Sequence, residues 1–113
     1  MSIQEKFDLS GQAAVVTGGV GLLGAEFCRT LAEAGASVAV VDLSAEAARK
    51  TAAELTDAGL RAEGFGVDIT DPTAVKEMVR AVLGSFGRLD ILVNSAALDP
   101  KFDPQAAARG IAP

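Results

Sequence analysis

The chain has 113 residues, half of them hydrophobic, and carries a net charge of −5. This length fits one small domain with a core of its own, and the apolar content argues against disorder. The acidic balance, without any cluster of Lys and Arg, argues against a nucleic-acid surface, and no apolar run is long enough for a membrane span. One cysteine and no histidine argue against an internal disulfide and a structural zinc site. We expect a cytoplasmic protein that holds no metal.

Short apolar segments alternate with segments of helical period from residue 13 onward. Alternation at this spacing predicts an α/β fold, in which parallel strands form a sheet with helices on both faces. Right-handed crossovers then give the strand order 3-2-1-4. The expected strands are 13–17, 37–42, 61–67 and 90–94, and the expected helices are 23–34, 45–58 and 72–86.

Apolar residues recur at helical spacing in each expected helix and predict its buried face. The sets are Leu23, Phe27, Leu31 and Ala34 in the first helix, Ala48, Ala52 and Leu55 in the second, and Val75, Met78, Val79, Val82, Leu83 and Phe86 in the third. The single cysteine, Cys28, is predicted to be a buried structural thiol, because no nearby group would lower its pKa.

A glycine-rich turn joins the first strand to the first helix. The sequence there reads Thr17-Gly18-Gly19-Val20-Gly21-Leu22-Leu23-Gly24. Glycines allow a tight reversal and let a phosphate approach the backbone, while the N–H groups and positive dipole end of the next helix attract an anion. Strand, turn and helix together are the context in which such a motif indicates phosphate binding. The alternative is a tight turn without a ligand.

Asp42 ends the second strand, 18 residues after Gly24. A carboxylate there can accept hydrogen bonds from both ribose hydroxyls of an adenosine, and it would repel a 2′-phosphate. No Lys or Arg stands at Gly19 or Leu43, where a counter-charge could lie. NAD is therefore favoured over NADP. The alternative is a helix-capping aspartate, although Ser44 also offers a cap.

Two further polar residues end the third and fourth strands. Asp68 and Ile69 could meet the edge and the face of an adenine, or Asp68 could cap the entry to the third helix. Asn94 could tie the fourth strand to neighbouring loops through its amide, or its backbone could line the cofactor cleft.

These motifs resemble those of the short-chain dehydrogenase/reductase family, over residues 7–98 and in the N-terminal half of such an enzyme. The resemblance rests on the glycine-rich turn, on Asp42, on Val67-Asp68-Ile69-Thr70 and on the segment 86–94. It implies a Rossmann-type half-domain over residues 1–98.

The resemblance also implies how NAD would be held. The turn would hold the pyrophosphate, Asp42 the adenosine ribose, and Asp68 with Ile69 the adenine, while residues 94–96 would line the cofactor. The implied cofactor-binding residues are Gly18, Gly19, Gly21, Leu22, Leu23, Gly24, Asp42, Leu43, Asp68, Ile69, Asn94 and Ala96.

The chain departs from the family pattern at two places. Leu22 stands where the shorter family members usually have glycine, so the spacing is that of the longer, nucleotide-sugar-acting members. The segment Asn94-Ser95-Ala96-Ala97 replaces the usual Asn-Asn-Ala-Gly. A methyl group then lies where the backbone nears the cofactor, which we expect binding to tolerate.

The family's chemistry requires a Tyr-x-x-x-Lys pair, in which tyrosine transfers a proton and lysine lowers its pKa and holds the nicotinamide ribose. The 113 residues contain no tyrosine. We therefore expect the NAD-binding portion of an oxidoreductase, truncated before its catalytic residues, with an irregular tail over 99–113 and a homo-oligomeric full-length form. The fourth strand would then be an open apolar edge. Two alternatives stay open: a non-catalytic nucleotide-binding module, and half of a nucleotide-sugar epimerase or dehydratase.

Overall fold

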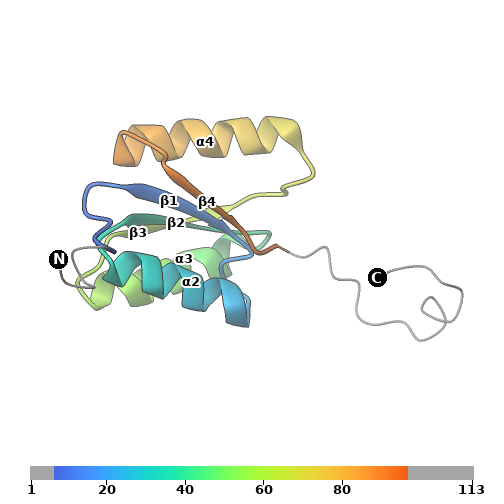
Figure 1. The fold of residues 1–113 in the computed structure, drawn as a ribbon. Helices are drawn as coiled ribbons and strands as arrows, with labels where there is room; N and C mark the ends of the chain where they lie inside the picture. The colour runs from blue at the N-terminus through green and yellow to red at the C-terminus, as the bar shows by residue number, and fades with distance from the viewer. Residues whose placement is uncertain (1–6, 97–113) are drawn as a thin grey trace, which may run out of the picture.

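The computed structural model describes residues 7–96 and forms a four-stranded parallel sheet with helices on both faces (Figure 1). The strand order is β3-β2-β1-β4, which confirms the predicted fold class and topology. The predicted tail over 99–113 lies outside the described residues. The elements are β1 (Ala13–Thr17), α2 (Leu22–Glu33), β2 (Ser37–Asp42), α3 (Ala45–Asp57), β3 (Ala62–Gly66), α4 (Pro72–Phe86) and β4 (Ile91–Asn94).

The order of connections reverses at β1. The chain moves outward from β1 through α2 to β2 and through α3 to β3, and then returns through α4 to pair β4 with the other side of β1. As a result α2 and α3 lie on one face of the sheet and α4 lies on the other (Figure 1). Such a reversal leaves a crevice beyond the carboxyl ends of the strands, where open α/β sheets bind ligands.

The two central strands are buried on both faces, and alternate residues serve the two layers. Val16, Val38 and Val40 pack with residues of α2 and α3, whereas Val15 and Val41 pack with residues of α4. This alternation follows from the two-residue period of a strand. It explains why β1 and β2 read as continuous apolar runs, as central parallel strands do.

The buried face of α2 differs from the predicted one. Gly24, Cys28 and Ala32 are buried, whereas Leu23 is 64% exposed and Phe27 only partly buried. The small residues let α2 approach the sheet closely, which turns the larger apolar side chains toward the margin of the contact. Burial raises the pKa of the Cys28 thiol to about 11, so the prediction of a buried structural thiol is confirmed.

The predicted inner faces of the other two helices agree better with the structure. Ala48, Ala52 and Leu55 are buried in α3, as predicted. In α4, Met78 and Val82 are buried, but Leu83 is 45% exposed and does not belong to the inner face.

β3 lies unusually close to α3 because it contains two glycines. A Cβ at Gly64 would lie 2.5 Å from the backbone of Ala48, and one at Gly66 would lie 2.4 Å from the Cβ of Ala45. β3 is therefore seated directly on the first turns of α3, and this contact positions the loop that follows β3.

Asp90 fastens the start of β4 to the start of β1. Its carboxylate accepts a hydrogen bond from the Ala13 N–H at 2.9 Å, and its own N–H donates to the Ala13 carbonyl at 2.9 Å. Arg88 donates to both carboxylate oxygens at 2.7 Å. The hydrogen bond from Arg88, with that from Ala13, holds the pKa of Asp90 below its ordinary value.

β4 has one strand neighbour, β1, among residues 7–96, and Leu92 on it is 67% exposed. Within this part of the chain, the outer side of β4 is thus the open apolar edge that the sequence suggested. None of the helices described is both long and apolar enough to cross a membrane.

A pair of glycine substitutions tests the contact between β3 and α3. Gly64→Ala is expected to lower the free energy of unfolding by about 1–3 kcal/mol, because the added methyl meets backbone that cannot move aside. Gly84→Ala, on the open surface of α4, is expected to raise it by up to about 1 kcal/mol through helix propensity. Urea unfolding followed by circular dichroism measures both. Equal stability of Gly64→Ala and the unchanged protein would mean that β3 is not seated this closely.

Asp90→Asn tests the link between β4 and β1 through its pH dependence. Because the pKa of Asp90 is lowered in the folded state, the carboxylate stabilises the fold above its ordinary pKa of about 3.9, and this contribution is lost as the pH falls through the lowered value. The variant is therefore expected to be less stable than the unchanged protein near neutral pH and equally stable in acid, once the pH is below the lowered pKa of Asp90. Unfolding curves at both pH values, with the exposed Asp57→Asn as control, measure the difference. A stability gap that persists in acid contradicts the assignment.

Candidate functional site

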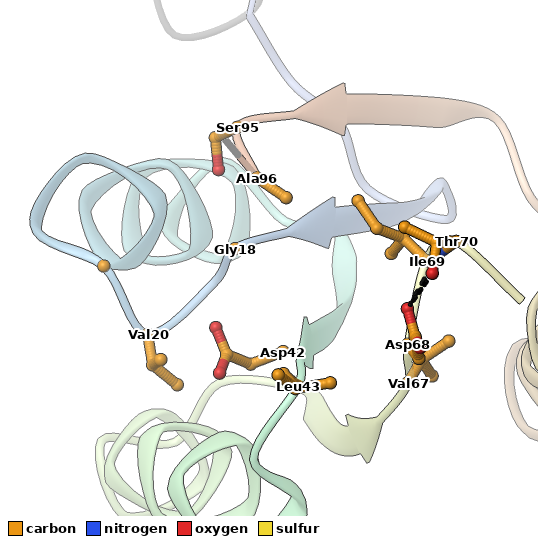
Figure 2. A pocket seen from close by; sticks show the side chains of 11 residues that line it. Gly18, Val20, Asp42, Leu43, Val67, Asp68, Ile69, Thr70, Ser95 and Ala96 are labelled. Carbon is orange, nitrogen blue, oxygen red and sulfur yellow. Dashed lines mark hydrogen bonds between the residues drawn. The ribbon is translucent and has the colours of Figure 1, made fainter. Parts of the chain in front are cut away.

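A cavity of about 450 Å³ opens at the carboxyl ends of the parallel strands, and its lining comes from the segments that follow all four strands (Figure 2). It lies at the crevice created by the reversal at β1. The lining residues are Gly18, Val20, Gly21, Asp42, Leu43, Val67, Asp68, Ile69, Thr70, Ser95 and Ala96.

Gly18 begins the turn after β1 and requires glycine for two reasons. Its φ of +68° lies in the left-handed region, and a Cβ there would lie 2.8 Å from the Cα of Ala96. Gly19 faces the core instead, since its N–H donates to the Val41 carbonyl at 3.0 Å and its Cβ would lie 2.7 Å from a methyl of Val40. Gly19 is thus a packing residue that does not line the cavity.

Gly24 lies beneath the turn rather than in the cavity. A Cβ at Gly24 would lie 1.9 Å from the carbonyl oxygen of Gly18, so only glycine allows α2 to begin where it does. Gly21 is different, because it lines the cavity and a Cβ there would meet only the Gly18 carbonyl, at 3.4 Å. The predicted phosphate glycines therefore divide into Gly19 and Gly24, which only shape the turn, and Gly18 and Gly21, which also line the cavity.

The N-terminus of α2 faces the cavity without a side-chain cap. Its N-cap is Gly21, and its first turn contains no acidic residue. By contrast, Ser44 caps α3 through Ala47 N–H at 3.1 Å, and Asp71 caps α4 through Thr73 N–H at 3.0 Å. Among the three helices described, α2 alone thus leaves its first N–H groups and positive dipole end available to an anion.

The side chains of Leu22 and Leu23 do not line this cavity. Leu22 is 96% exposed, and both residues fall within the first turn of α2. Their contribution to an anion site is therefore the backbone N–H groups of that turn, which lack an intrahelical acceptor by their position.

Asp42 is half-buried at the end of β2, with its carboxylate on the side of the cavity where Val20 lies (Figure 2). One oxygen accepts a hydrogen bond from Ser44 N–H at 3.2 Å, and the other has no partner among the described residues. Because Ser44 performs the capping of α3, Asp42 keeps an acceptor oxygen that is available to a ligand.

Asp68 organises the loop after β3. One of its carboxylate oxygens accepts hydrogen bonds from the Thr70 hydroxyl at 2.6 Å and the Thr70 N–H at 2.9 Å, and its carbonyl accepts from Asp71 N–H at 3.0 Å. The hydroxyl bond, then the N–H bond, lowers the pKa of Asp68 below its ordinary value. Asp71 is the cap of α4, so Asp68 holds the loop that presents the partly buried Ile69 to the cavity.

A hydrogen-bond network joins the ends of β1 and β4. The Thr17 hydroxyl donates to the amide oxygen of Asn94 at 3.0 Å, and the Ser95 hydroxyl donates to the Thr17 carbonyl. Asn94 therefore ties β4 to β1, which is the structural interpretation of this residue, and its side chain does not line the cavity. Ser95 and Ala96 continue into the cavity wall beside Gly18.

The cavity brings together part of the predicted site and adds residues that the sequence did not single out. The predicted residues that line it are Gly18, Gly21, Asp42, Leu43, Asp68, Ile69 and Ala96, and those outside the lining are Gly19, Leu22, Leu23, Gly24 and Asn94. Ser95 also lines the cavity, within the segment 94–96 that was expected to line the cofactor, and the added residues are Val20, Val67 and Thr70. Each of these is the chain neighbour of a predicted residue, so adjacency was the available signal.

The residues present fit the adenosine and phosphates of a dinucleotide. The uncapped start of α2 suits a phosphate, the open side of Gly21 leaves room for it, and the available Asp42 oxygen suits hydroxyl donors. Apolar surface from Leu43, Val67 and Ile69 suits a base.

Comparison with known proteins shows the same architecture in oxidoreductases. D-threitol dehydrogenase from Mycolicibacterium smegmatis is 41% identical over 98 residues, covering 87% of this chain and 38% of that protein. A hydroxysteroid dehydrogenase from Escherichia coli has a TM-score of 0.80 at 34% identity, covering 95% of this chain and 47% of the other. An oxidoreductase from Haemophilus influenza with bound NAD has a TM-score of 0.81 at 30% identity, covering 93% and 36%.

The chain spans less than half the length of each of these three proteins. The family model described as short chain dehydrogenase matches residues 12–109, which is most of the chain. The glycine-rich turn, Asp42 and the loop after β3 all lie inside that match. The chain therefore belongs to the short-chain dehydrogenase family.

Proposed function

We propose that this chain is the NAD-binding portion of an oxidoreductase that moves a hydride between nicotinamide and an alcohol or carbonyl carbon. The observation that carries the proposal is that the uncapped start of α2 and the available oxygen of Asp42 border one cavity. A structural neighbour with bound NAD, and a relative named D-threitol dehydrogenase, support the proposal.

In this proposal each part of the cavity binds one part of the cofactor. The N–H groups at the start of α2 hold the pyrophosphate, Asp42 accepts from the ribose hydroxyls, and Ile69 contacts the adenine. NAD supplies the hydride-accepting ring, while the chain's own residues bind and orient the molecule.

NAD rather than NADP is the proposed cofactor. A 2′-phosphate would lie against the Asp42 carboxylate, and Leu43, beside it, carries no compensating charge. The nearest residues that follow, Ser44 and Ala45, are uncharged as well. The negative charge of Asp42, without a neighbouring cation, would therefore favour a free ribose diol over a 2′-phosphate.

Proton transfer is assigned to residues outside this chain, because the 113 residues contain no tyrosine. The same fact favours a second candidate, a nucleotide-binding module without catalysis. The two differ in whether a longer polypeptide carrying this segment oxidises an alcohol with NAD.

The Gly18, Gly21 and Gly24 spacing also keeps the nucleotide-sugar alternative open for the whole protein. Cytoplasmic location and a homo-oligomeric full-length form stay predictions.

Asp42→Asn tests the ribose contact and the cofactor preference. Loss of a charged acceptor is expected to weaken NAD binding by about 1.5–3 kcal/mol, roughly 10- to 150-fold in Kd, and to reduce the preference for NAD over NADP. Isothermal titration calorimetry of the 113-residue chain with each cofactor measures both effects. Asp57→Asn, at the exposed end of α3, is the matched control. Unchanged NAD affinity in Asp42→Asn would refute the role of Asp42.

Gly21→Ala and Gly24→Ala separate phosphate contact from packing. A Cβ at Gly21 would make one ordinary contact with the protein, so Gly21→Ala is expected to lose at most about 1 kcal/mol of stability. The same methyl group would occupy room left for the phosphate, so NAD affinity is expected to fall at least about tenfold. Gly24→Ala forces the turn to move and is expected to reduce both affinity and stability. Calorimetry and thermal unfolding give the two readouts. Unchanged NAD affinity in Gly21→Ala would mean that the phosphate does not bind beside Gly21.

A further inference from the structure

β3 is an open edge of the sheet, on the side away from β4. Among residues 7–96 its only strand neighbour is β2, with which it runs parallel. The hydrogen bonds at its two ends show which of its groups face β2. The Arg61 carbonyl accepts from the Val38 N–H at 3.0 Å, and the Val67 N–H donates to the Asp42 carbonyl at 2.8 Å. Positions 61 and 67 therefore direct these backbone groups toward β2.

Alternate positions of β3 face away from β2. Successive residues of a strand direct their N–H and carbonyl groups to opposite edges, so positions 63 and 65 face β2 as well. The backbone groups of Ala62, Gly64 and Gly66 thus point toward the open edge, and no described residue outside β2 forms a backbone hydrogen bond with them. These three residues have a methyl group or no side chain, which leaves room for an added strand.

A hollow lies on each face of the sheet beside this edge. The hollow on the α3 side has a volume of about 370 Å³ and is lined by residues 62–65 and by α3 residues that include Arg49 and Thr56. The hollow on the α4 side has a volume of about 220 Å³ and is lined by residues 65–67 and by α4 residues that include Glu77 and Met78. A strand laid along β3 would direct consecutive side chains to these two faces in turn.

The α3 side of the edge carries a cation. A Cβ at Gly64 or Gly66 would point at α3, so the side chains of this strand that face α3 are small and uncharged. The charged group that α3 contributes to the hollow is Arg49, which is exposed and forms no ion pair within residues 7–96.

The α4 side of the edge is acidic. Phe65 packs with the core cluster beneath α4, so by alternation Glu63 points to that side as well. Glu77 borders the hollow there, and neither glutamate has an ion-pair partner in the described part of the chain. Arg61 reaches the same side, but its guanidinium lies 5.8 Å from the centroid of the Phe86 ring.

We propose that the open edge of β3 binds an extended segment of a partner protein as an added strand. The segment carries acidic side chains toward α3, where Arg49 lies, and basic side chains toward α4, where Glu63 and Glu77 lie. Backbone hydrogen bonds supply affinity in such strand addition, and hollows for alternate side chains supply specificity. The two hollows share only Val67 with the cavity at the strand ends, so this is a second site.

The charges disfavour a second copy of this chain as the added strand. Two copies of β3 would pair antiparallel about a two-fold axis normal to the sheet, which places α3 beside α3 and α4 beside α4. Arg49 would then lie on the same side as its counterpart, and Glu63 and Glu77 would face theirs. Like charges brought together at an interface suppress such pairing.

Fluorescence anisotropy with labelled peptides and the 113-residue chain, at physiological ionic strength, tests the proposal. The probe is a blocked peptide of about ten residues with Glu and Val on one face of its extended form and Lys and Thr on the other. A control peptide of the same composition mixes Glu and Lys on each face. The probe is expected to bind at least about fivefold more tightly than the control peptide, because only its charges match both sides of the edge.

Three variants locate the bound peptide. Arg49→Glu is expected to weaken binding of the probe at least about fivefold, whereas Lys50→Glu, the same charge reversal on α3 outside the hollow, changes it less than about twofold. Ala62→Pro removes a backbone N–H that faces the open edge, and it is expected to weaken the probe at least about fivefold. Its circular dichroism is expected to stay that of the unchanged chain, because an edge strand tolerates proline where the N–H faces away from the sheet.

Several results would overturn the inference. Equal affinity for the two peptides, or equal effects of Arg49→Glu and Lys50→Glu, would mean that charge pairing at this edge does not select the segment. Full binding by a folded Ala62→Pro variant would place the peptide elsewhere. Dimers of the unchanged chain in analytical ultracentrifugation that Ala62→Pro abolishes would make a second copy the occupant. None of these results bears on the proposed NAD site, which calorimetry measures separately.

Discussion

The first turn of α2 packs directly on the carbonyl of Gly18, and the site depends on this contact. Because Gly24 has no Cβ, the helix begins within one short turn of the end of β1 and points its free N–H groups toward the cavity. The same turn is held from the other side by the Val41 carbonyl and by the wall at Ala96. The position of the proposed anion site thus depends on backbone packing and not on any charged side chain.

This arrangement is how the acidic chain would attract the proposed anionic ligand. The net charge of −5 is spread along the sequence, and solvent ions screen charges on exposed side chains. The N–H groups of α2 act at short range and have fixed orientation, so their effect at the cavity is local. In the proposed function, Asp42 beside this helix start would favour hydroxyl donors and disfavour a 2′-phosphate.

The fold could be predicted from the sequence because its signals are local. Apolar runs, caps such as Ser44 and Asp71, and terminating glycines gave the element order, and right-handed crossovers gave the strand order. The buried face of α2 was predicted only in part: Phe27 and Leu31 pack against the core, but Leu23 is exposed, because hydrophobic period favours large residues. Close packing at the turn selects small residues instead, and that requirement appears only in three dimensions.

The site could be predicted in part for the same reason. Gly18, Gly21, Asp42 and Ile69 lie at strand ends, and the carboxyl ends of parallel strands meet at one edge. The sequence could not reveal which carboxylate oxygens form hydrogen bonds within the protein. One oxygen of Asp68 accepts hydrogen bonds from Thr70, whereas one oxygen of Asp42 stays available, and both arrangements depend on the local loop geometry.

The cavity wall at the end of β4 has a consequence for the dynamics of the sheet. An edge strand is ordinarily among the first parts of a fold to open, and β4 is joined to β1 across 77 residues of chain by Asp90 and Asn94. Any ligand that binds only while Ser95 and Ala96 are in place removes the opened form from the equilibrium. Binding of such a ligand would be thermodynamically coupled to closure of β4, and hydrogen exchange at the amides of that strand would slow as the ligand concentration rises.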